Sequence, residues 1–180
     1  MADNRRVRMT KKLMKDALLE LLEQHPLNKI TVTDVCQSAD VNRSTFYAYY
    51  EDVEALMLDI ENDVLAQLPG SPERPDIYSD EKFLSTLKVF FDYVRENERL
   101  FRIMIVVRDS DSFNQKLVKA VMERYRRVSG NVDSLSERYA YIYCVSGVIG
   151  MMKAWIMEGF PMETHAFAQM VLQLSAQVTT

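Results

Sequence analysis

The densest group of side chains able to bind another molecule lies in residues 30–50, ITVTDVCQSADVNRSTFYAYY. Arg43, Ser44 and Thr45 follow one another where the pattern predicts the first turn of a helix. Arginine can pair with both acceptors on the guanine edge, and a serine or threonine hydroxyl can bond several bases. Four flanking hydroxyl side chains could donate to phosphates, namely Thr31, Thr33, Tyr47 and Tyr49. The chemistry that these residues predict is recognition of DNA.

Two short helices are expected to position these groups. Thr31 and Asp34 have the spacing of a capping box, which predicts a helix that begins at Thr31. Asp40 falls where the following turn favours a positive φ, which Asp tolerates better than most residues. Asn42 is a favourable N-cap for a second helix that runs to Tyr49. Helices of this size joined by a short turn are typical of the helix-turn-helix, whose second helix enters the major groove.

The aromatic residues at the end of this stretch divide between two faces. Phe46 and Tyr50 are four residues apart and are expected to pack inward, which leaves Tyr47 and Tyr49 on the outer side. The competing interpretations are that both outer tyrosines are ordinary packed aromatics and that Arg43 is a solvated surface charge.

The sequence FYAYY after NRST, preceded by ITVTDVCQSADV, resembles the helix-turn-helix of the TetR family of bacterial transcription regulators. The resemblance covers about residues 8–68, with the motif itself at about 31–50. It implies an all-α protein of about nine helices, in which a three-helix DNA-binding domain is joined by a connecting helix to a second helical domain at 77–180. It also implies a homodimer on a pseudo-palindromic operator of double-stranded DNA, acting as a repressor that a small molecule of unknown identity releases.

The resemblance also assigns roles to single positions. The positions that it places against bases are Arg43, Ser44, Thr45 and Ala48, and those that it places against phosphates are Thr31, Thr33, Asn42, Tyr47 and Tyr49. Two positions depart from the family pattern. Asp40 stands where glycine is usual, and Val53, among acidic neighbours, stands where a phosphate-binding lysine is frequent. We therefore expect the N-terminal arm to contribute more to DNA binding than the start of the fourth helix.

Charge is distributed unevenly along this chain of net charge −4. Residues 1–50 hold 8 Lys and Arg against 6 Asp and Glu, whereas residues 51–180 hold 14 against 20. The first helix is expected to start near Thr10, and the basic side chains cluster around that point: Arg5, Arg6, Arg8, Lys11 and Lys12. This N-terminal arm either follows the DNA backbone or enters the minor groove, or it is a disordered solubilising tail.

Apolar periodicity predicts the remaining helices. The stripe of the first helix is expected to contain Leu13, Ala17, Leu18, Leu21 and Leu22. Further helices are expected at about 52–68, 80–96, 98–108, 110–129, 134–158 and 163–178. Three Pro and one Gly make 69–76 a loop and a domain boundary.

The second domain is rich in aromatic and methionine residues, which build either an effector pocket or a plain core. The candidate pocket residues are Phe90, Phe101, Met104, Tyr125, Tyr143 and Trp155. Gly147 and Gly150 would let another helix approach closely, so segments 134–158 and 163–178 are expected to form a four-helix dimer interface. Packing within one chain is the alternative. Trp155 followed by Glu158–Pro161 resembles a C-terminal domain common in the TetR family.

Other functions find little support in the residues. Cys36 and Cys144 lie far apart without a Cys/His cluster, so reduced thiols are expected, with neither a metal site nor a cofactor. His25 and His165 stand outside any catalytic motif, which argues against an enzyme. The apolar run 140–152 is shorter than a bilayer requires and is expected to be a buried core helix. Without a signal peptide, we expect a cytoplasmic protein with no membrane partner. A helical interaction protein, or a partner-controlled activator of the same fold, is the alternative function.

Overall fold

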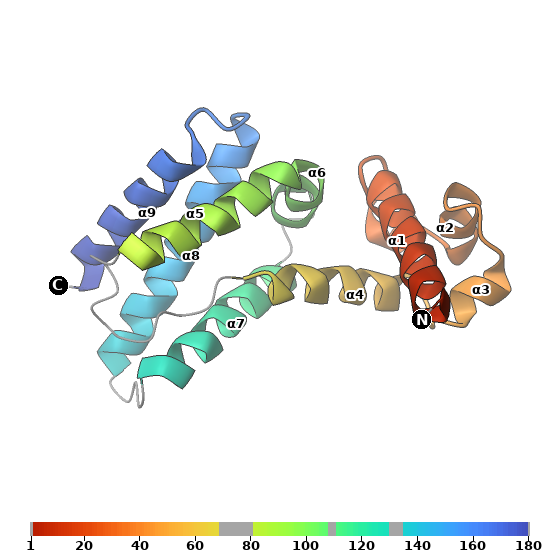
Figure 1. The fold of residues 1–180 in the computed structure, drawn as a ribbon, viewed down its shortest axis with the longest axis horizontal. Coiled ribbons are helices and arrows are strands. Elements are labelled where there is room, and N and C mark those ends of the chain that lie inside the picture. The colour runs from red at the N-terminus through yellow and green to blue at the C-terminus, as the bar shows by residue number, and fades with distance from the viewer. Residues whose placement is uncertain (1, 69–80, 108–110, 130–134, 180) are drawn as a thin grey trace. The chain divides into compact units, whose positions relative to one another are not determined.

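The computed structural model describes residues 2–68, 81–107, 111–129 and 135–179 (Figure 1). Within these ranges the chain forms helices and no strand, which confirms the predicted all-α class. Contacts divide the chain into two compact units, residues 1–66 and residues 67–180, and each unit has its own apolar core.

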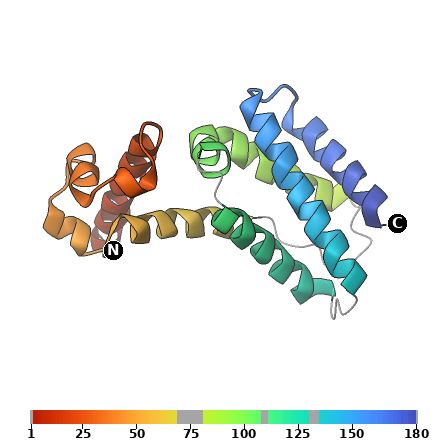
Figure 2. The same ribbon diagram turned by 180° about the vertical axis from the view of Figure 1, so that it is seen from behind.

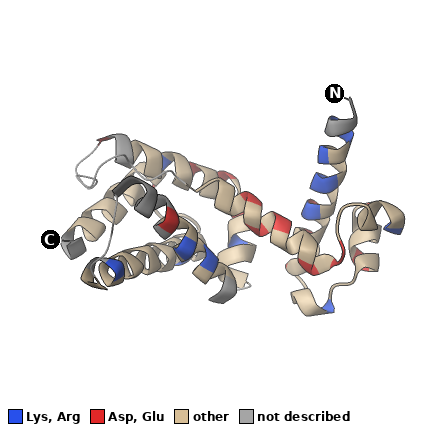
Figure 3. Ribbon diagram, turned by 90° about the horizontal axis from the view of Figure 1, so that it is seen from below, with Lys and Arg blue, Asp and Glu red and all other residues tan. Residues whose placement is uncertain are grey.

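Unit 1 contains four α-helices: α1 (Ala2–Leu22), α2 (Val32–Ser38), α3 (Arg43–Tyr47) and α4 (Val53–Ala66). A short 3₁₀ turn, Leu27–Lys29, follows Pro26 between the first two. The structure corrects the expected start of α1, because Thr10 lies inside the helix and its hydroxyl donates to the carbonyl of Arg6, 3.0 Å away. No Gly or Pro interrupts residues 2–22, so the helix extends through the basic segment. Lys and Arg therefore line the first half of α1 rather than an extended arm (Figure 3).

The core of unit 1 forms where α1 packs against α2 and α4, and where α2 packs against α3. Leu13, expected on the apolar stripe of α1, is 46% exposed, and Met14 is fully buried in its place. Phe46 and Tyr50 are buried as predicted. The expected stripe is also buried within α4: Val53, Leu56, Met57, Ile60 and Val64. Its last expected member, Leu68, is buried too but lies beyond the end of α4, in unit 2.

Unit 2 has a helix at each expected segment (Figure 2). Its helices are α5 (Glu81–Glu96), α6 (Glu98–Phe101), α7 (Asp111–Ser129), α8 (Leu135–Met157) and α9 (Thr164–Thr179). The segment expected as a single helix at 98–108 is instead α6 followed by a π-helical turn, η3 (Arg102–Val107). The Arg102 guanidinium donates to Glu98 on α6 and to the carbonyl of Ile156 on α8, at 2.8 and 2.9 Å.

Aromatic rings fill the core of unit 2 between α5, α8 and α9. The indole of Trp155 stacks on Phe167 at 4.4 Å between ring centroids, and Phe91 meets the Phe167 ring edge-on at 4.8 Å. All three rings are at most 2% exposed. This packing fixes α9 against both α5 and α8, beside which it lies in Figure 1.

The apolar helix α8 is not the buried core helix that its composition predicted. It buries one face, with Val145, Met152, Trp155 and Ile156, whereas Tyr139 and Tyr143 are more than half exposed. By length and composition alone, its stretch Arg138–Met157 could cross a membrane. Only 17% of the most apolar window of this stretch is buried in the protomer. Among the described residues, a large apolar face of this helix is thus left uncovered.

Candidate nucleic-acid interface

All nine predicted DNA-binding residues lie at the surface of unit 1, on or beside α2 and α3. Six of them are exposed: Thr31, Asn42, Arg43, Ser44, Tyr47 and Ala48. Thr33, Thr45 and Tyr49 are half-buried. The division of aromatic residues follows the prediction, since Tyr47 is 58% exposed while its neighbour Phe46 is fully buried and meets it edge-on.

The start of α2 is held by the predicted capping box. The Thr31 backbone N–H donates to the Asp34 carboxylate at 2.8 Å, and the Asp34 N–H donates to the Thr31 hydroxyl oxygen at 3.3 Å. The Thr31 hydroxyl proton is also directed at the Asp34 carboxylate, so a phosphate would compete with the cap for this hydroxyl. The hydroxyl bond, and then the backbone bond, hold the pKa of Asp34 below its usual value.

Helix α3 differs from the expectation at both of its ends. Asn42 occupies the N-cap position with extended backbone angles, but its side chain makes no capping hydrogen bond. Its amide is therefore not committed to the helix end. The helix also ends at Tyr47, and Ala48 is its C-cap.

The turn between α2 and α3 has the predicted left-handed residue. Asp40 has φ 51°, and the Val41 N–H donates to the Cys36 carbonyl at 3.0 Å, which closes the end of α2. The tight closure fixes the angle at which α3 leaves α2.

Arg43 and Thr33 meet across this turn. The Arg43 guanidinium, at the first position of α3, donates a hydrogen bond to the Thr33 hydroxyl oxygen on α2. Burial raises the pKa of the neighbouring Cys36 thiol, and the Arg43 charge opposes that rise. Sequence reasoning assigned both Arg43 and Thr33 to DNA but did not anticipate their mutual contact.

A polar network that sequence reasoning missed joins α1, α4 and the end of the recognition segment, residues 30–50. The buried Tyr50 hydroxyl donates to the Asp59 carboxylate at 2.7 Å, and the Lys15 ammonium lies 2.9 Å from Asp59 and 2.6 Å from Asp63. Lys11 lies 3.6 Å from Asp59 and over the Tyr50 ring. Lysines and aspartates each spaced four apart on two helices were the available signal.

These contacts determine how two of the groups titrate. Burial would raise the pKa of Asp59, but hydrogen bonds from Tyr50 and Lys15, with the charges of Lys15 and Lys11, hold it below its usual value. Burial, and then Asp59 itself, raises the pKa of the Tyr50 hydroxyl. The hydroxyl is thus a donor throughout the physiological range, and it fixes the last aromatic of the motif against α4.

The acidic residues before α4 have a structural use. The Asp52 carboxylate accepts the Ala55 backbone N–H at 2.7 Å, which satisfies the start of α4. Val53 is buried at 7% exposure, whereas Glu51 and Glu54 are exposed. Asp52 therefore serves the helix end, and no basic side chain of α4 stands beside it in its first turn.

The predicted pocket residues of unit 2 do not come together around one space. Phe101, Met104 and Trp155 are buried in the core, whereas Tyr143 is 67% exposed on α8. The side chain of Tyr125 lies outside the described residues. Of the five that are described, Phe90 lines a hollow of about 350 Å³, whose other walls are Gln67, Thr86, Val89, Asp92, Tyr93 and Glu96. Dense packing of the interior explains the difference, because large side chains facing inward fill the space they were expected to line.

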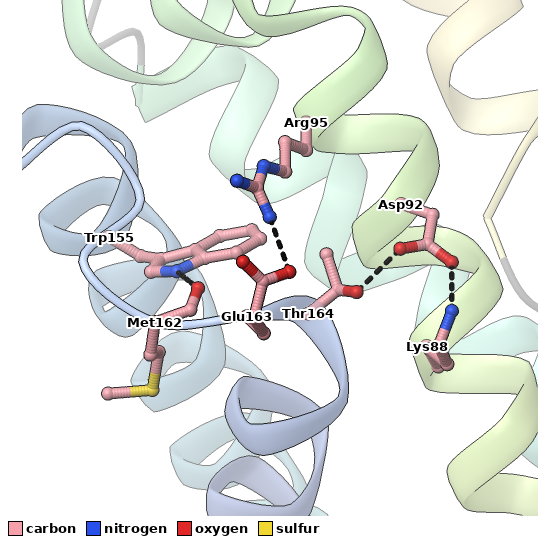
Figure 4. Close-up of polar contacts among 7 residues, drawn as sticks. All are labelled: Lys88, Asp92, Arg95, Trp155, Met162, Glu163 and Thr164. Carbon is pink, nitrogen blue, oxygen red and sulfur yellow. Dashed lines mark hydrogen bonds and ion pairs between the residues drawn. The ribbon is translucent and has the colours of Figure 1, made fainter.

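A hydrogen bond and an ion pair connect the start of α9 to α5 (Figure 4). The buried Thr164 hydroxyl donates to Asp92 at 2.5 Å, and Arg95 pairs with Glu163 at 2.9 Å. Lys88, 2.6 Å from Asp92, is the main cause of the lowered pKa of that carboxyl.

The corner between α8 and α9 is held by its own residues. The Trp155 indole N–H donates to the Met162 carbonyl at 3.0 Å, and Gly159 and Phe160 both have positive φ. The Phe160 ring packs edge-on against Trp155 at 4.7 Å. The motif that the sequence singled out thus builds a tight interhelical corner.

Comparisons with known proteins agree with this architecture. A family model described as bacterial regulatory proteins of the tetR family matches residues 16–60, and a model described as a transcriptional regulator C-terminal region matches residues 81–177. The chain belongs to the TetR family of transcriptional regulators. Its matched N-terminal region contains the cap, the turn and the recognition segment described above, as expected for a TetR-family helix-turn-helix.

The similarity to individual proteins extends over nearly the whole chain. The transcriptional activator DhaS of the dhaKLM operon of Lactococcus lactis is 22% identical over 176 residues, which cover 94% of this chain and 91% of DhaS. A TetR regulator structure from Streptococcus agalactiae is 25% identical, with a TM-score of 0.68 and coverage of 97% and 98% of the two chains. SmeT in complex with triclosan shares the fold at 14% identity and a TM-score of 0.62, covering 94% and 90%. The first two relatives are regulators, which supports a regulatory rather than enzymatic role.

Proposed function

We propose that this protein is a homodimeric repressor that binds a pseudo-palindromic operator through α3 and releases it when a small molecule binds unit 2. The observation that carries the proposal is the exposure of Arg43 and Ser44 in the first turn of α3 and of Ala48 at its C-cap. In this arrangement Arg43, Ser44, Thr45 and Ala48 read base edges. The phosphate contacts come from Thr31, Asn42, Tyr47 and Tyr49, and from the basic side of α1, whereas the Thr33 hydroxyl is bonded to Arg43.

Dimerisation is supported by the exposed face of α8. Tyr139, Tyr143, Gly147, Gly150 and Met157 recur along one side of this helix and are exposed in the protomer. A second copy, related by a two-fold axis, would cover these residues with its own α8 and α9. The result would be an isologous four-helix interface. The two recognition helices would then read the two half-sites of a palindrome.

An effector site is supported by the hollow beside α5. Its lining includes the aromatic side chains of Phe90 and Tyr93 and the carboxylates of Asp92 and Glu96. Its volume of about 350 Å³ suits a small organic molecule. SmeT, which shares this fold, forms a complex with one such molecule, triclosan.

An activator controlled by a partner protein is the second candidate. It is favoured by the likeness to DhaS, which is a transcriptional activator, over most of the chain. The aromatic core of unit 2 also favours a partner-controlled activator. Phe91, Trp155 and Phe167 pack closely against one another, so these rings form a core rather than the walls of a small-molecule pocket. The DNA-binding surface would be the same. The differences would be that the protein activates transcription instead of repressing it, and that a partner protein rather than a small molecule controls it.

Selection of genomic fragments by the purified protein tests the proposal. Enrichment of one palindromic sequence, bound by two protomers, is the expected result. Transcription from a promoter carrying that sequence should then fall when the protein is added and recover when the effector binds. Enrichment with increased transcription would favour the activator, and no enrichment above random DNA would favour an interaction protein without DNA binding.

A further inference from the structure

The contact between Thr33 and Arg43 joins two helices through side chains that both belong to the proposed DNA surface. Thr33 is the second residue of α2, and Arg43 is the first residue of α3. The guanidinium Nη2 donates to the threonine Oγ1. Thr33 is half-buried, whereas Arg43 is exposed, so the less exposed residue holds the more exposed one.

The backbone around both residues is fixed independently of this contact. The Thr31–Asp34 capping box holds the first turn of α2. Closure of the turn through the Val41 N–H and the Cys36 carbonyl sets where α3 begins. The distance between the two side chains is therefore a product of the helix-turn-helix itself, and the contact does not depend on a flexible loop.

A hydroxyl is a suitable anchor for an arginine that must read a base. A guanidinium has five donors, so one bond to Thr33 leaves enough for a bidentate pair with guanine. A carboxylate at this position would bind the guanidinium bidentately and compete with guanine, whereas the neutral hydroxyl accepts one bond and leaves the charge available. Holding a long side chain before binding also lowers the entropic cost of ordering it in the complex.

We propose that Thr33 is a positioning residue for sequence recognition, whose hydroxyl holds the Arg43 guanidinium in the orientation that reads a base edge. This inference rests on the proposed function, in which Arg43 faces a base. It gives Thr33 a role different from the phosphate contact that the family resemblance implies. The two roles have opposite consequences, because a phosphate contact affects every DNA sequence and a positioning contact affects one base pair.

Thr33→Val is the informative variant, because valine keeps the shape and branching of threonine and lacks the hydroxyl. Thr33→Ser is the matched control, because it keeps the hydroxyl. Both are made in the wild type and in an Arg43→Ala background. Affinity is measured for three duplexes: the selected site, the site changed at the base pair where Arg43→Ala relaxes preference, and an unrelated sequence.

Thr33→Val is expected to reduce the preference at that base pair about three- to tenfold, the range that ordering one long side chain can supply. Thr33→Ser should keep the preference, and Thr33→Val should have no effect in the Arg43→Ala background. Affinity for the unrelated duplex should not change. Circular dichroism of each variant before the titrations checks that unit 1 is folded.

Equal weakening of all three duplexes, with a reduced dependence on salt, would overturn the positioning role and identify Thr33 as a phosphate contact. An unchanged preference in Thr33→Val would overturn it as well. Wild-type protein that binds the selected and unrelated duplexes equally would instead refute the proposed function, and that result is visible before any Thr33 variant is compared.

Discussion

The Tyr50 hydroxyl donates a 2.7 Å hydrogen bond to the Asp59 carboxylate, and this bond ties the end of the recognition segment to α4. Tyr50 is 5% exposed, and Lys15 of α1 also reaches Asp59. Three parts of unit 1 thus meet at one carboxylate. The orientation of the proposed DNA-reading face depends on this junction as well as on the apolar core.

Removing the hydroxyl should weaken unit 1 without disturbing its packing. Tyr50→Phe keeps the ring against Phe46 and leaves Asp59 with one donor fewer, so we expect a loss of about 1–2 kcal/mol in the free energy of unfolding. Urea denaturation measures it. Tyr47→Phe, which removes an exposed hydroxyl, is the control and should change stability little. Equal stabilities of Tyr50→Phe and wild type would show that the bond contributes nothing.

Asp59 should make stability depend on pH in the acid range. Its folded pKa lies below the unfolded value, so its contribution is present at neutral pH and is lost as the pH falls from about 4 through the lowered pKa. The gap in unfolding free energy between wild type and Asp59→Asn should therefore be largest near neutrality and shrink in acid. Glu51→Gln, at an exposed carboxylate just before the same helix, is the control and should leave a small gap at every pH. A gap for Asp59→Asn that stays constant across this range would contradict the assignment.

Asp40 combines a strained conformation with a charge close to the proposed DNA surface. Asp40→Ala should cost about 1–2 kcal/mol relative to Asp40→Gly, because a left-handed residue with a Cβ and no local hydrogen bonding is unfavourable. Thermal or urea unfolding measures this difference. Asp40→Asn and Asp40→Gly both remove the charge, so both should bind DNA more tightly than wild type. Tighter binding by the glycine variant alone would show that conformation, rather than charge, limits affinity.

The glycines of α8 offer a test of the proposed dimer. A Cβ added at Gly150 meets no atom within 4 Å in the protomer, so Gly150→Leu should stabilise the isolated helix by up to about 1 kcal/mol. In a four-helix interface the same side chain would obstruct close packing. We expect sedimentation velocity to show dissociation of the dimer in Gly150→Leu and not in Ser85→Leu, a change at an exposed position of α5. An unchanged sedimentation coefficient would place the interface elsewhere.

Local rules predicted much of the DNA-binding unit. The Thr31–Asp34 spacing predicted the capping box, and the Asp40 position predicted the left-handed turn, because both depend on residues a few positions apart. The predicted start of α1 was wrong, since Thr10 is a good N-cap only where no stronger helix former precedes it. The Tyr50–Asp59 bond joins the segment that follows α3 to α4, and periodicity within one helix carries no information about it.

The proposed effector pocket was less predictable for a related reason. Composition identifies aromatic residues but not the direction in which each points, and Tyr143 and Trp155 of the same helix have opposite exposures. The hollow beside α5 includes Thr86 and Glu96, which no aromatic pattern would select. Surface hollows depend on how helices diverge, and divergence is a property of tertiary packing.

The most direct test compares the affinity of the wild-type protein for its selected site with that for a scrambled duplex of the same length, by fluorescence anisotropy at two salt concentrations. We expect a preference on the order of 10³ or more for the selected site, and affinity that falls steeply with salt. Arg43→Ala should lose about 1–3 kcal/mol on the selected site and little on the scrambled duplex. Equal affinity of the wild type for both duplexes would contradict sequence-specific recognition by α3.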